Sequence, residues 1–117
     1  MATRTPTVVD NNMRSATYQW TGLLNGDTGS PLEIADYADR SVQIGGTLGT
    51  GGSVTIEGSN DGSVYVALVD PQGNALTFTA LAKIEQVLEV TRYIRPNVTA
   101  GDGSTNFTVT LFGRRNG

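Results

Sequence analysis

The residues best suited to chemistry in this sequence are acids and amides set among glycines. The stretch Ser59-Asn60-Asp61-Gly62 gathers the amide and carboxylate oxygens that calcium prefers as ligands. A calcium site needs roughly six to eight oxygens, and a calcium loop spaces its acids at alternate positions, which this stretch does not do. The stretch lies between two segments of alternating hydrophobicity, the place where Asn, Asp and Gly form a tight reversal. The sequence therefore favours a hairpin turn here and predicts no metal site.

Three acids lie close together in a long segment rich in turn formers: Glu33, Asp36 and Asp39. Paired carboxylates can hydrolyse glycosidic bonds. No motif beyond proximity supports that chemistry here, and acids in loops are usually only solvated. The glycine-rich stretch GGTLGTGG, residues 45–52, has the glycine content of a phosphate-binding loop, but it lacks the Lys-Ser/Thr pair and precedes strands rather than a helix.

The chain of 117 residues contains no histidine and no cysteine. This composition removes the commonest general base, the commonest zinc ligand and every disulfide. A serine nucleophile would need a lysine base, and Lys83 is the single lysine of the sequence. There is also no Gly-x-Ser-x-Gly motif. We therefore expect a protein that is not an enzyme and that holds no cofactor, catalytic residue or metal.

The charge balance restricts the partners. The formal net charge is -3, and charged residues make up 16% of the sequence, so no basic stripe is available to neutralise phosphates. We expect neither a nucleic-acid nor a membrane partner. No apolar run approaches the roughly 18 residues of a membrane span, and the first residues lack the apolar region of a signal peptide, which predicts synthesis in the cytoplasm.

Alternating hydrophobicity predicts strands along most of the chain. The first begins at Ala16 and places Tyr18, Trp20, Gly22 and Leu24 on one face, with Trp20 in the core. Later alternating or apolar segments fall at 42–48, 54–57, 64–69, 75–79, 93–100 and 106–113.

The segment 80–90 fits both a helix and a strand. We favour a strand, with Ile84, Leu88 and Val90 on one face, because the segment lies between strands and ends in Val90-Thr91. Seven or eight short strands predict an all-β, single-domain β-sandwich of the jelly-roll kind at residues 16–117. Residues 1–15 show no sustained period and are predicted to form an extended N-terminal arm.

A few residues are candidates for contacts with another chain. Val8 and Val9 form an apolar pair within the arm, and Tyr37 has no periodic partners, which is typical of an exposed aromatic at an interface. Arg114 and Arg115 could pair with acids of a neighbouring subunit, or could simply keep the end of the sequence in solvent. The predicted interface residues are therefore Val8, Val9, Tyr37, Arg114 and Arg115.

Two long stretches resemble small structural proteins of tailed-bacteriophage virions, of the head decoration or cement type. They are SVQIGGTLGTGGSVTIEGSNDGSVYVALVDPQGNALTFTA, from Ser41, and VTRYIRPNVTAGDGSTNFTVTLFGR, which ends at Arg114. The resemblance implies a capsid decoration protein, commonly a homotrimer, that lies on the virion surface. Its implied partner is the major capsid protein, whose mature lattice it stabilises, and the arm could add backbone pairing with a neighbour.

The same elements are also similar to discoidin-like and other jelly-roll carbohydrate-binding modules, in which an aromatic residue such as Tyr65 follows an acidic turn. A carbohydrate-binding module and a tail- or fibre-associated virion protein are therefore the alternatives.

Overall fold

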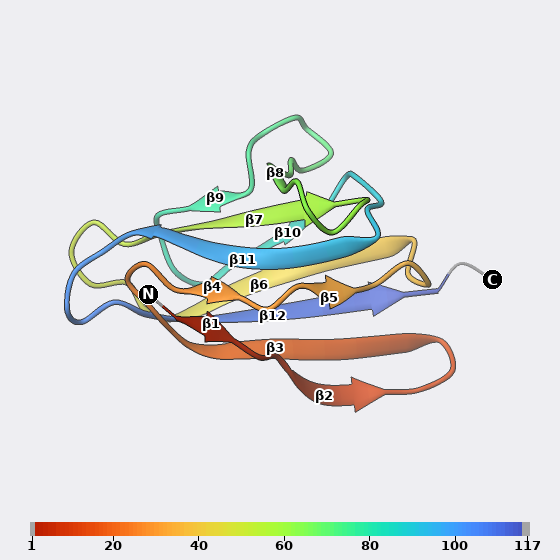
Figure 1. Ribbon diagram of the computed structural model, residues 1–117, viewed down its shortest axis with the longest axis horizontal. Helices are drawn as coiled ribbons and strands as arrows, with labels where there is room; N and C mark the ends of the chain where they lie inside the picture. The colour runs from red at the N-terminus through yellow and green to blue at the C-terminus, as the bar shows by residue number, and fades with distance from the viewer. Residues whose placement is uncertain (1, 116–117) are drawn as a thin grey trace.

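The alternating segments form two β-sheets that pack face to face (Figure 1). The structure is a computed structural model that describes residues 2–115. Met1 of the predicted arm and residues 116–117 of the predicted sandwich lie outside the described residues. The strands are β1 (Thr3–Arg4), β2 (Thr7–Asn11), β3 (Ser15–Leu24), β4 (Thr28–Gly29), β5 (Leu32–Glu33), β6 (Asp39–Thr47), β7 (Ser53–Ser59), β8 (Val66–Ala67), β9 (Thr77–Phe78), β10 (Lys83–Gln86), β11 (Tyr93–Ala100) and β12 (Asn106–Arg114).

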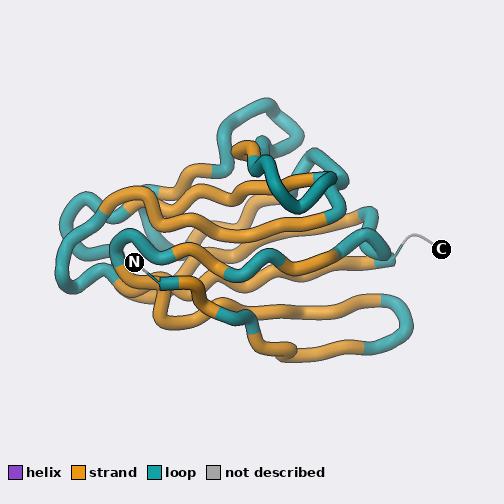
Figure 2. Tube along the Cα trace, viewed as in Figure 1, coloured by secondary structure: helices purple, strands orange, loops and turns teal. Residues whose placement is uncertain are grey.

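The pairing of the strands is that of a jelly roll. The five-stranded sheet has the order β10-β6-β12-β3-β2. In the seven-stranded sheet β11 lies between β7 on one side and β4 and β5 on the other, while β8 and β9 pair with β7. The chain crosses from one sheet to the other after β1, β3, β5, β6, β9, β10 and β11, which confirms the predicted all-β sandwich of the jelly-roll kind. Figure 2 shows strands and loops along the described chain.

The core lies between the two sheets and is built by alternate residues of the long strands. Trp20 on β3 is 1% exposed, and its indole Nε1 donates to the carbonyl of Ser30 at 3.1 Å. On β12, Phe107, Val109 and Leu111 are all buried. The predicted placement of Trp20 in the core is confirmed.

A β-bulge changes which residues of β3 face the core. Val109 pairs with Trp20, but Phe107 pairs with Leu23, so β3 carries one residue more than β12 between these two pairs. Gly22, which lies within the bulge, has a φ of 66°. As a result Leu23 is buried and Leu24 is 42% exposed, so the prediction that Leu24 faces inward is wrong.

The ambiguous segment 80–90 contains a strand, β10, which pairs with β6 at the edge of the five-stranded sheet. The strand prediction is thus confirmed for Lys83–Gln86. The predicted inward face is wrong: Ile84 is 63% exposed, Leu88 51% and Val90 60%, while Val87 is buried. The reason is that β10 presents Ile84 on the outer side of the sheet, and the chain leaves the sheet after Gln86.

The stretch at residues 59–62 is the turn of the β7–β8 hairpin, as predicted. The carboxylate of Asp61 accepts hydrogen bonds from the backbone N–H groups of Ser63 at 2.9 Å and Val64 at 3.0 Å, and from the hydroxyl of Ser59 at 2.9 Å. Gly62 has a φ of 78°, a left-handed conformation that glycine adopts without strain. All three hydrogen bonds end on Oδ1 of Asp61, so this oxygen holds the turn in shape.

Candidate interaction surfaces

The N-terminal segment lies along the open side of the sandwich and adds a strand to each sheet (Figure 1). β1 pairs in parallel with β4, and β2 pairs with β3 as the outermost strand of the five-stranded sheet. Val8 and Val9 on β2 are 61% and 57% exposed. The register shifts between Val8 and Asp10, so a bulge interrupts this edge. Such a bulge is one of the features by which proteins discourage a foreign strand from pairing.

Asp27 fastens the start of this segment to the sandwich. Its carboxylate is buried and accepts from the backbone N–H of Ala2 at 2.8 Å, from Nε of Arg4 at 3.0 Å and from the N–H of Leu24 at 2.9 Å. Burial by itself raises the pKa of Asp27, but the hydrogen bonds from Leu24, Arg4 and Ala2 outweigh it, and the net pKa lies below the ordinary value. Asp27 is therefore held as a carboxylate that orders β1.

The acids of the long loop each pair with a different arginine at one end of the sandwich. The pairs are Arg92 with Glu33 at 2.7 Å, Arg115 with Asp36 at 3.5 Å, and Arg114 with Asp39 at 2.8 Å. We call these six residues the charged end. Arg114 and Arg115, which were predicted to meet acids of a neighbouring subunit or to lie in solvent, thus pair with acids of their own chain.

Tyr37 lies beneath this charged end and not on its surface. Its side chain is 5% exposed, so the expectation of an exposed aromatic contact is wrong. Gly113 on β12 makes room for it: a Cβ at this glycine would lie 2.9 Å from Cβ and Cγ of Tyr37. The guanidinium carbon of Arg115 lies 5.5 Å from the centre of the Tyr37 ring. The two predicted interface residues Tyr37 and Arg115 therefore contact each other.

A pocket of about 500 Å³ opens beside this tyrosine. Its lining combines residues of β2, β3, β5, the β5–β6 loop and the segment after β12: Asn11, Tyr18, Glu33, Ala35, Asp36, Tyr37 and Arg115. Burial and the neighbouring Tyr37 raise the pKa of Tyr18 above its ordinary value, so the Tyr18 phenol stays protonated at neutral pH.

Arg40 is a buried cation without a carboxylate partner among residues 2–115. It is 2% exposed, and its guanidinium donates to the carbonyls of Tyr37 at 2.8 Å, Ile34 at 3.0 Å and Thr91 at 2.6 Å. Desolvation lowers the pKa of Arg40 to about 10, which leaves it charged at neutral pH. The side chain thus organises the backbone on which the charged end is built.

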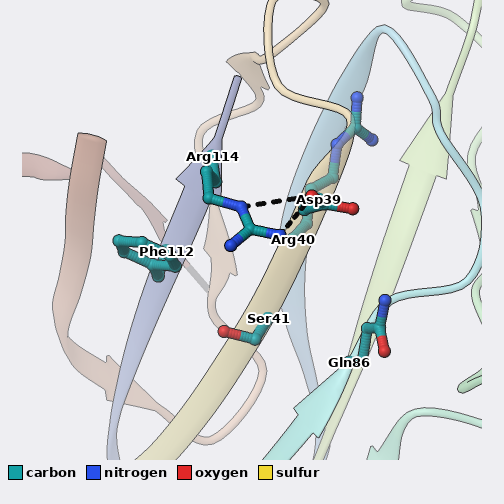
Figure 3. Close-up of a pocket in the computed structure, with 6 residues that line it drawn as sticks. All are labelled: Asp39, Arg40, Ser41, Gln86, Phe112 and Arg114. Atoms are coloured by element: carbon teal, nitrogen blue, oxygen red, sulfur yellow. Dashed lines mark hydrogen bonds and ion pairs between the residues drawn. The ribbon is translucent and has the colours of Figure 1, made fainter. Parts of the chain in front are cut away.

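A second pocket, of about 300 Å³, lies on the outer side of the five-stranded sheet at the same end (Figure 3). Phe112 and Ser41 line it from β12 and β6, and Gln86 lines it from β10. Arg114 closes one side, with its Nε and Nη2 both donating to one carboxylate oxygen of Asp39. Phe112 is 41% exposed. This is a solvent-facing aromatic on the central strand of the sheet.

On the opposite sheet, the aromatic residue that follows the 59–62 turn is stacked against an arginine. The guanidinium carbon of Arg95 lies 3.8 Å from the ring centre of Tyr65, and Arg95 also pairs with Glu57 at 3.0 Å. One face of the Tyr65 ring is therefore covered by its own chain.

No group of three or more acids that could hold a metal ion occurs among residues 2–115. The same part of the chain contains no helix that is long and apolar enough to cross a membrane.

No protein-family model matches the sequence, and no curated protein sequence is significantly similar to it. Among solved structures, the SPBc2 prophage-derived protein YomS has a similar fold, with a TM-score of 0.65 and 11% identity over 92% of this chain and 98% of that chain. The chain shares its fold with a protein of prophage origin. A cupin domain from Bordetella pertussis Tohama I matches with a TM-score of 0.45 and 18% identity, over 95% of this chain and 92% of that chain.

Two features of these surfaces were missed from the sequence. The sequence does not indicate that Arg40 is buried, because an arginine next to an aspartate is typical of two solvated charges. The sequence does give a signal for Phe112: in the strand 106–113 the alternation places Phe107, Val109 and Leu111 inward, so Phe112 is an aromatic residue in an outward position. A single exposed aromatic residue is ordinary on a protein surface, so this signal does not by itself indicate a site.

Proposed function

We propose that this protein is a virion structural protein of a tailed bacteriophage, which decorates the outer surface of the head and binds the major capsid protein. The observation that carries the proposal is the fold match to YomS, a prophage-derived protein, over nearly the whole of both chains. The resemblance of residues 41–114 to head decoration proteins points in the same direction. The proposed location is the capsid surface, after synthesis in the host cytoplasm.

The geometry suits a small protein that binds a shell in many copies. The N-terminal segment is paired with its own sandwich, and the acids of the charged end are paired within the chain. The protein can therefore dock as a preformed unit and pays little ordering entropy. A module that binds only the mature lattice stabilises that lattice by mass action against the pressure of the packaged DNA.

The test is a binding experiment on heads. Purified protein is added to expanded shells that lack it, the shells are sedimented, and the ratio of this chain to the major capsid protein is measured by quantitative mass spectrometry. We expect saturable binding with a copy number in simple proportion to the capsid lattice, and no binding to unexpanded shells. If only a few copies of this chain occur per virion, and these copies purify with tails, the protein is instead a tail or fibre protein. If the chain is absent from washed virions, a structural role is refuted.

A further inference from the structure

The turn between β3 and β4 contains the dipeptide Asn25-Gly26, which plays no part in the proposed function. The N–H of Asp27 donates to the carbonyl of Leu24 at 2.9 Å and closes the turn, with Asn25 and Gly26 at its two central positions. Asn25 is exposed, and its side-chain Nδ2 donates at 3.1 Å to the carbonyl of Gly101 in the β11–β12 loop. Figure 1 shows both connections at the end of the sandwich where the N-terminus lies.

We propose that Asn25 is a site of spontaneous deamidation in the folded protein, and that the reaction loosens the N-terminal strand β1. In the first step the backbone nitrogen of Gly26 loses its proton to water and forms a bond to Cγ of Asn25. The bond between Cγ and Nδ2 breaks, and the amide nitrogen takes up a proton and leaves as ammonia. The product is a five-membered cyclic imide that joins the two residues.

Water then opens the imide in one of two ways. If water adds to Cγ, the bond from Cγ to nitrogen breaks and residue 25 becomes an ordinary aspartate. If water adds to the main-chain carbonyl carbon, the bond from that carbon to nitrogen breaks, and the link to Gly26 then runs through Cγ, as in isoaspartate. Neither step oxidises or reduces any group, and water is the co-reactant of the whole sequence.

The surroundings of Gly26 leave the attacking nitrogen free. Among residues 2–115, the N–H of Gly26 and the carbonyl of Asn25 accept or donate no hydrogen bond. The peptide plane between them can therefore rotate, as it does between the two common turn types, and glycine adopts the φ values of both. Gly26 has a φ of 84°, and a Cβ added to it would meet no atom within 4 Å, so the turn has room to move.

The Asp61-Gly62 pair of the 59–62 turn could form the same imide, but its hydrogen bonds oppose the reaction. The N–H of Gly62 donates to Oγ of Ser59 at 2.9 Å. Oδ1 of Asp61 accepts three hydrogen bonds from the turn. Attack on Cγ of Asp61 would therefore break several contacts at once, whereas the side chain of Asn25 is held by an exposed hydrogen bond that water can replace.

The other asparagines of residues 2–115 are all followed by residues that carry side chains. A side chain on the following residue hinders the approach of its backbone nitrogen to Cγ. A second Asn-Gly pair, Asn116-Gly117, lies outside the described residues. The combination of a following glycine, a free N–H and an exposed side chain therefore occurs at Asn25 within residues 2–115.

The modification acts on β1 because Asn25 lies two residues before Asp27. A carboxylate at position 25 has no proton to donate to the carbonyl of Gly101, and it adds a negative charge next to the turn that carries Asp27. Isoaspartate also lengthens the main chain of the turn by one carbon. Both products disturb the backbone that directs Asp27 toward the N–H of Ala2 and Nε of Arg4.

The experiment ages the purified, folded full chain at mildly alkaline pH and follows each of its peptides by mass spectrometry. Electron-transfer fragmentation distinguishes isoaspartate from aspartate. We expect Asn25 to convert about 10-fold faster than any other asparagine of residues 2–115, or faster still, and a 10-fold ratio corresponds to about 1.4 kcal/mol in activation free energy. We expect no isoaspartate at Asp61 in the folded protein, but expect it to form there in urea. Asn25→Gln is the matched control, because its longer side chain would have to close a six-membered ring, and residue 25 should then stay unmodified.

Hydrogen exchange tests the consequence for β1. Each aged sample is compared with the fresh sample of the same variant, so that any direct effect of Asn25→Gln on the Gly101 contact cancels. We expect faster exchange in β1 of the aged wild type, unchanged protection in β6 and β7, and no effect of ageing in Asn25→Gln.

An intact Asn25 after ageing overturns the proposal, as does a conversion rate no higher than that of the other asparagines, or conversion in urea alone. Unchanged exchange in β1 of fully converted protein overturns the proposed loosening. None of these results depends on binding to phage heads.

Discussion

Arg40 donates a hydrogen bond to the carbonyl of Thr91 at 2.6 Å, a contact that joins the two sheets across 51 residues of sequence. Arg40 lies at the start of β6 in the five-stranded sheet, and Thr91 precedes β11 in the seven-stranded sheet. The same guanidinium also holds the carbonyls of Ile34 and Tyr37. One buried cation thus fixes the backbone of the long loop, and the ion pairs of the charged end form on a scaffold that is already ordered.

Replacing Arg40 by Met should destabilise the fold strongly. The apolar side chain fills a similar volume but leaves the carbonyls of Tyr37 and Thr91 without the donor they have in Arg40, while the carbonyl of Ile34 keeps the N–H of Tyr37. Each buried unsatisfied group costs about 1–3 kcal/mol. We expect the free energy of unfolding in urea to fall by about 3 kcal/mol or more. Arg92→Met is the matched control, because Arg92 pairs with Glu33 in solvent, and it should leave the unfolding midpoint nearly unchanged. Equal losses for the two variants would show that Arg40 does not organise the loop.

Asp27→Asn should loosen the N-terminal segment while the sandwich stays folded. The amide keeps an acceptor oxygen but loses the charge that holds Arg4 and the N–H of Ala2. We expect faster hydrogen exchange in β1 and β2, with unchanged protection in β7, β11 and β12. Because the pKa of Asp27 is lowered in the folded protein, its contribution is present at neutral pH and is lost as the pH falls through the folded value. Unchanged exchange in β1 would contradict the role given to Asp27.

Asp61 should make stability depend on pH at the acid end. The N–H groups of Val64 and Ser63 and the hydroxyl of Ser59 lower its pKa from 3.8 to about 2. A carboxyl group with a lowered folded pKa contributes stability above its unfolded pKa and loses it as the pH falls toward 2. We expect the melting temperature to drop between about pH 4 and 2, and to drop less steeply in Asp61→Asn, whose side-chain oxygen still accepts from the turn.

Calcium binding at the 59–62 turn, which the sequence does not favour, can be tested directly. We expect the wild-type melting temperature to be the same with calcium and with a chelator. A rise with calcium that Asp61→Ala abolishes would show that the 59–62 turn is a cation site after all. An Asp61→Asn variant with the wild-type pH dependence would show instead that this carboxylate is not held by the turn.

Alternation predicts the jelly roll because a sandwich strand has one buried and one solvated face, and residues such as Val109 and Leu111 report that directly. The predicted inward direction of a side chain is wrong where strand pairing differs from that of a continuous, regular strand with its apolar residues inward. The bulge at Gly22 moves Leu24 to the surface, and the register of β10 on β6 places Ile84 on the outer side of the sheet. These errors arise from pairing between distant strands, which a local pattern does not contain.

The exposure of the residues predicted to lie at an interface follows less directly from the sequence, for a related reason. Val8 and Val9 are exposed on the edge strand β2, as a contact with another chain would require. Tyr37 is buried because of a residue 76 positions away in sequence, Gly113, whose missing side chain leaves the space. A small residue inside a strand is a visible signal of close approach, but the sequence does not name the group that approaches.

Gly113→Ala should therefore act on Tyr37. The new Cβ would lie 2.9 Å from Cβ and Cγ of Tyr37, a distance at which one of the two must move. Overpacking of this kind costs about 1–3 kcal/mol, and we expect a loss of that size in urea unfolding. Gly45→Ala is the matched control, since Gly45 also lies in a strand of the five-stranded sheet but has no atom within 4 Å of its added Cβ. If the cost arises from Tyr37, then Gly113→Ala should be nearly neutral in a Tyr37→Gly background, which removes both Cβ and Cγ. A full loss in that background would place the strain elsewhere in β12.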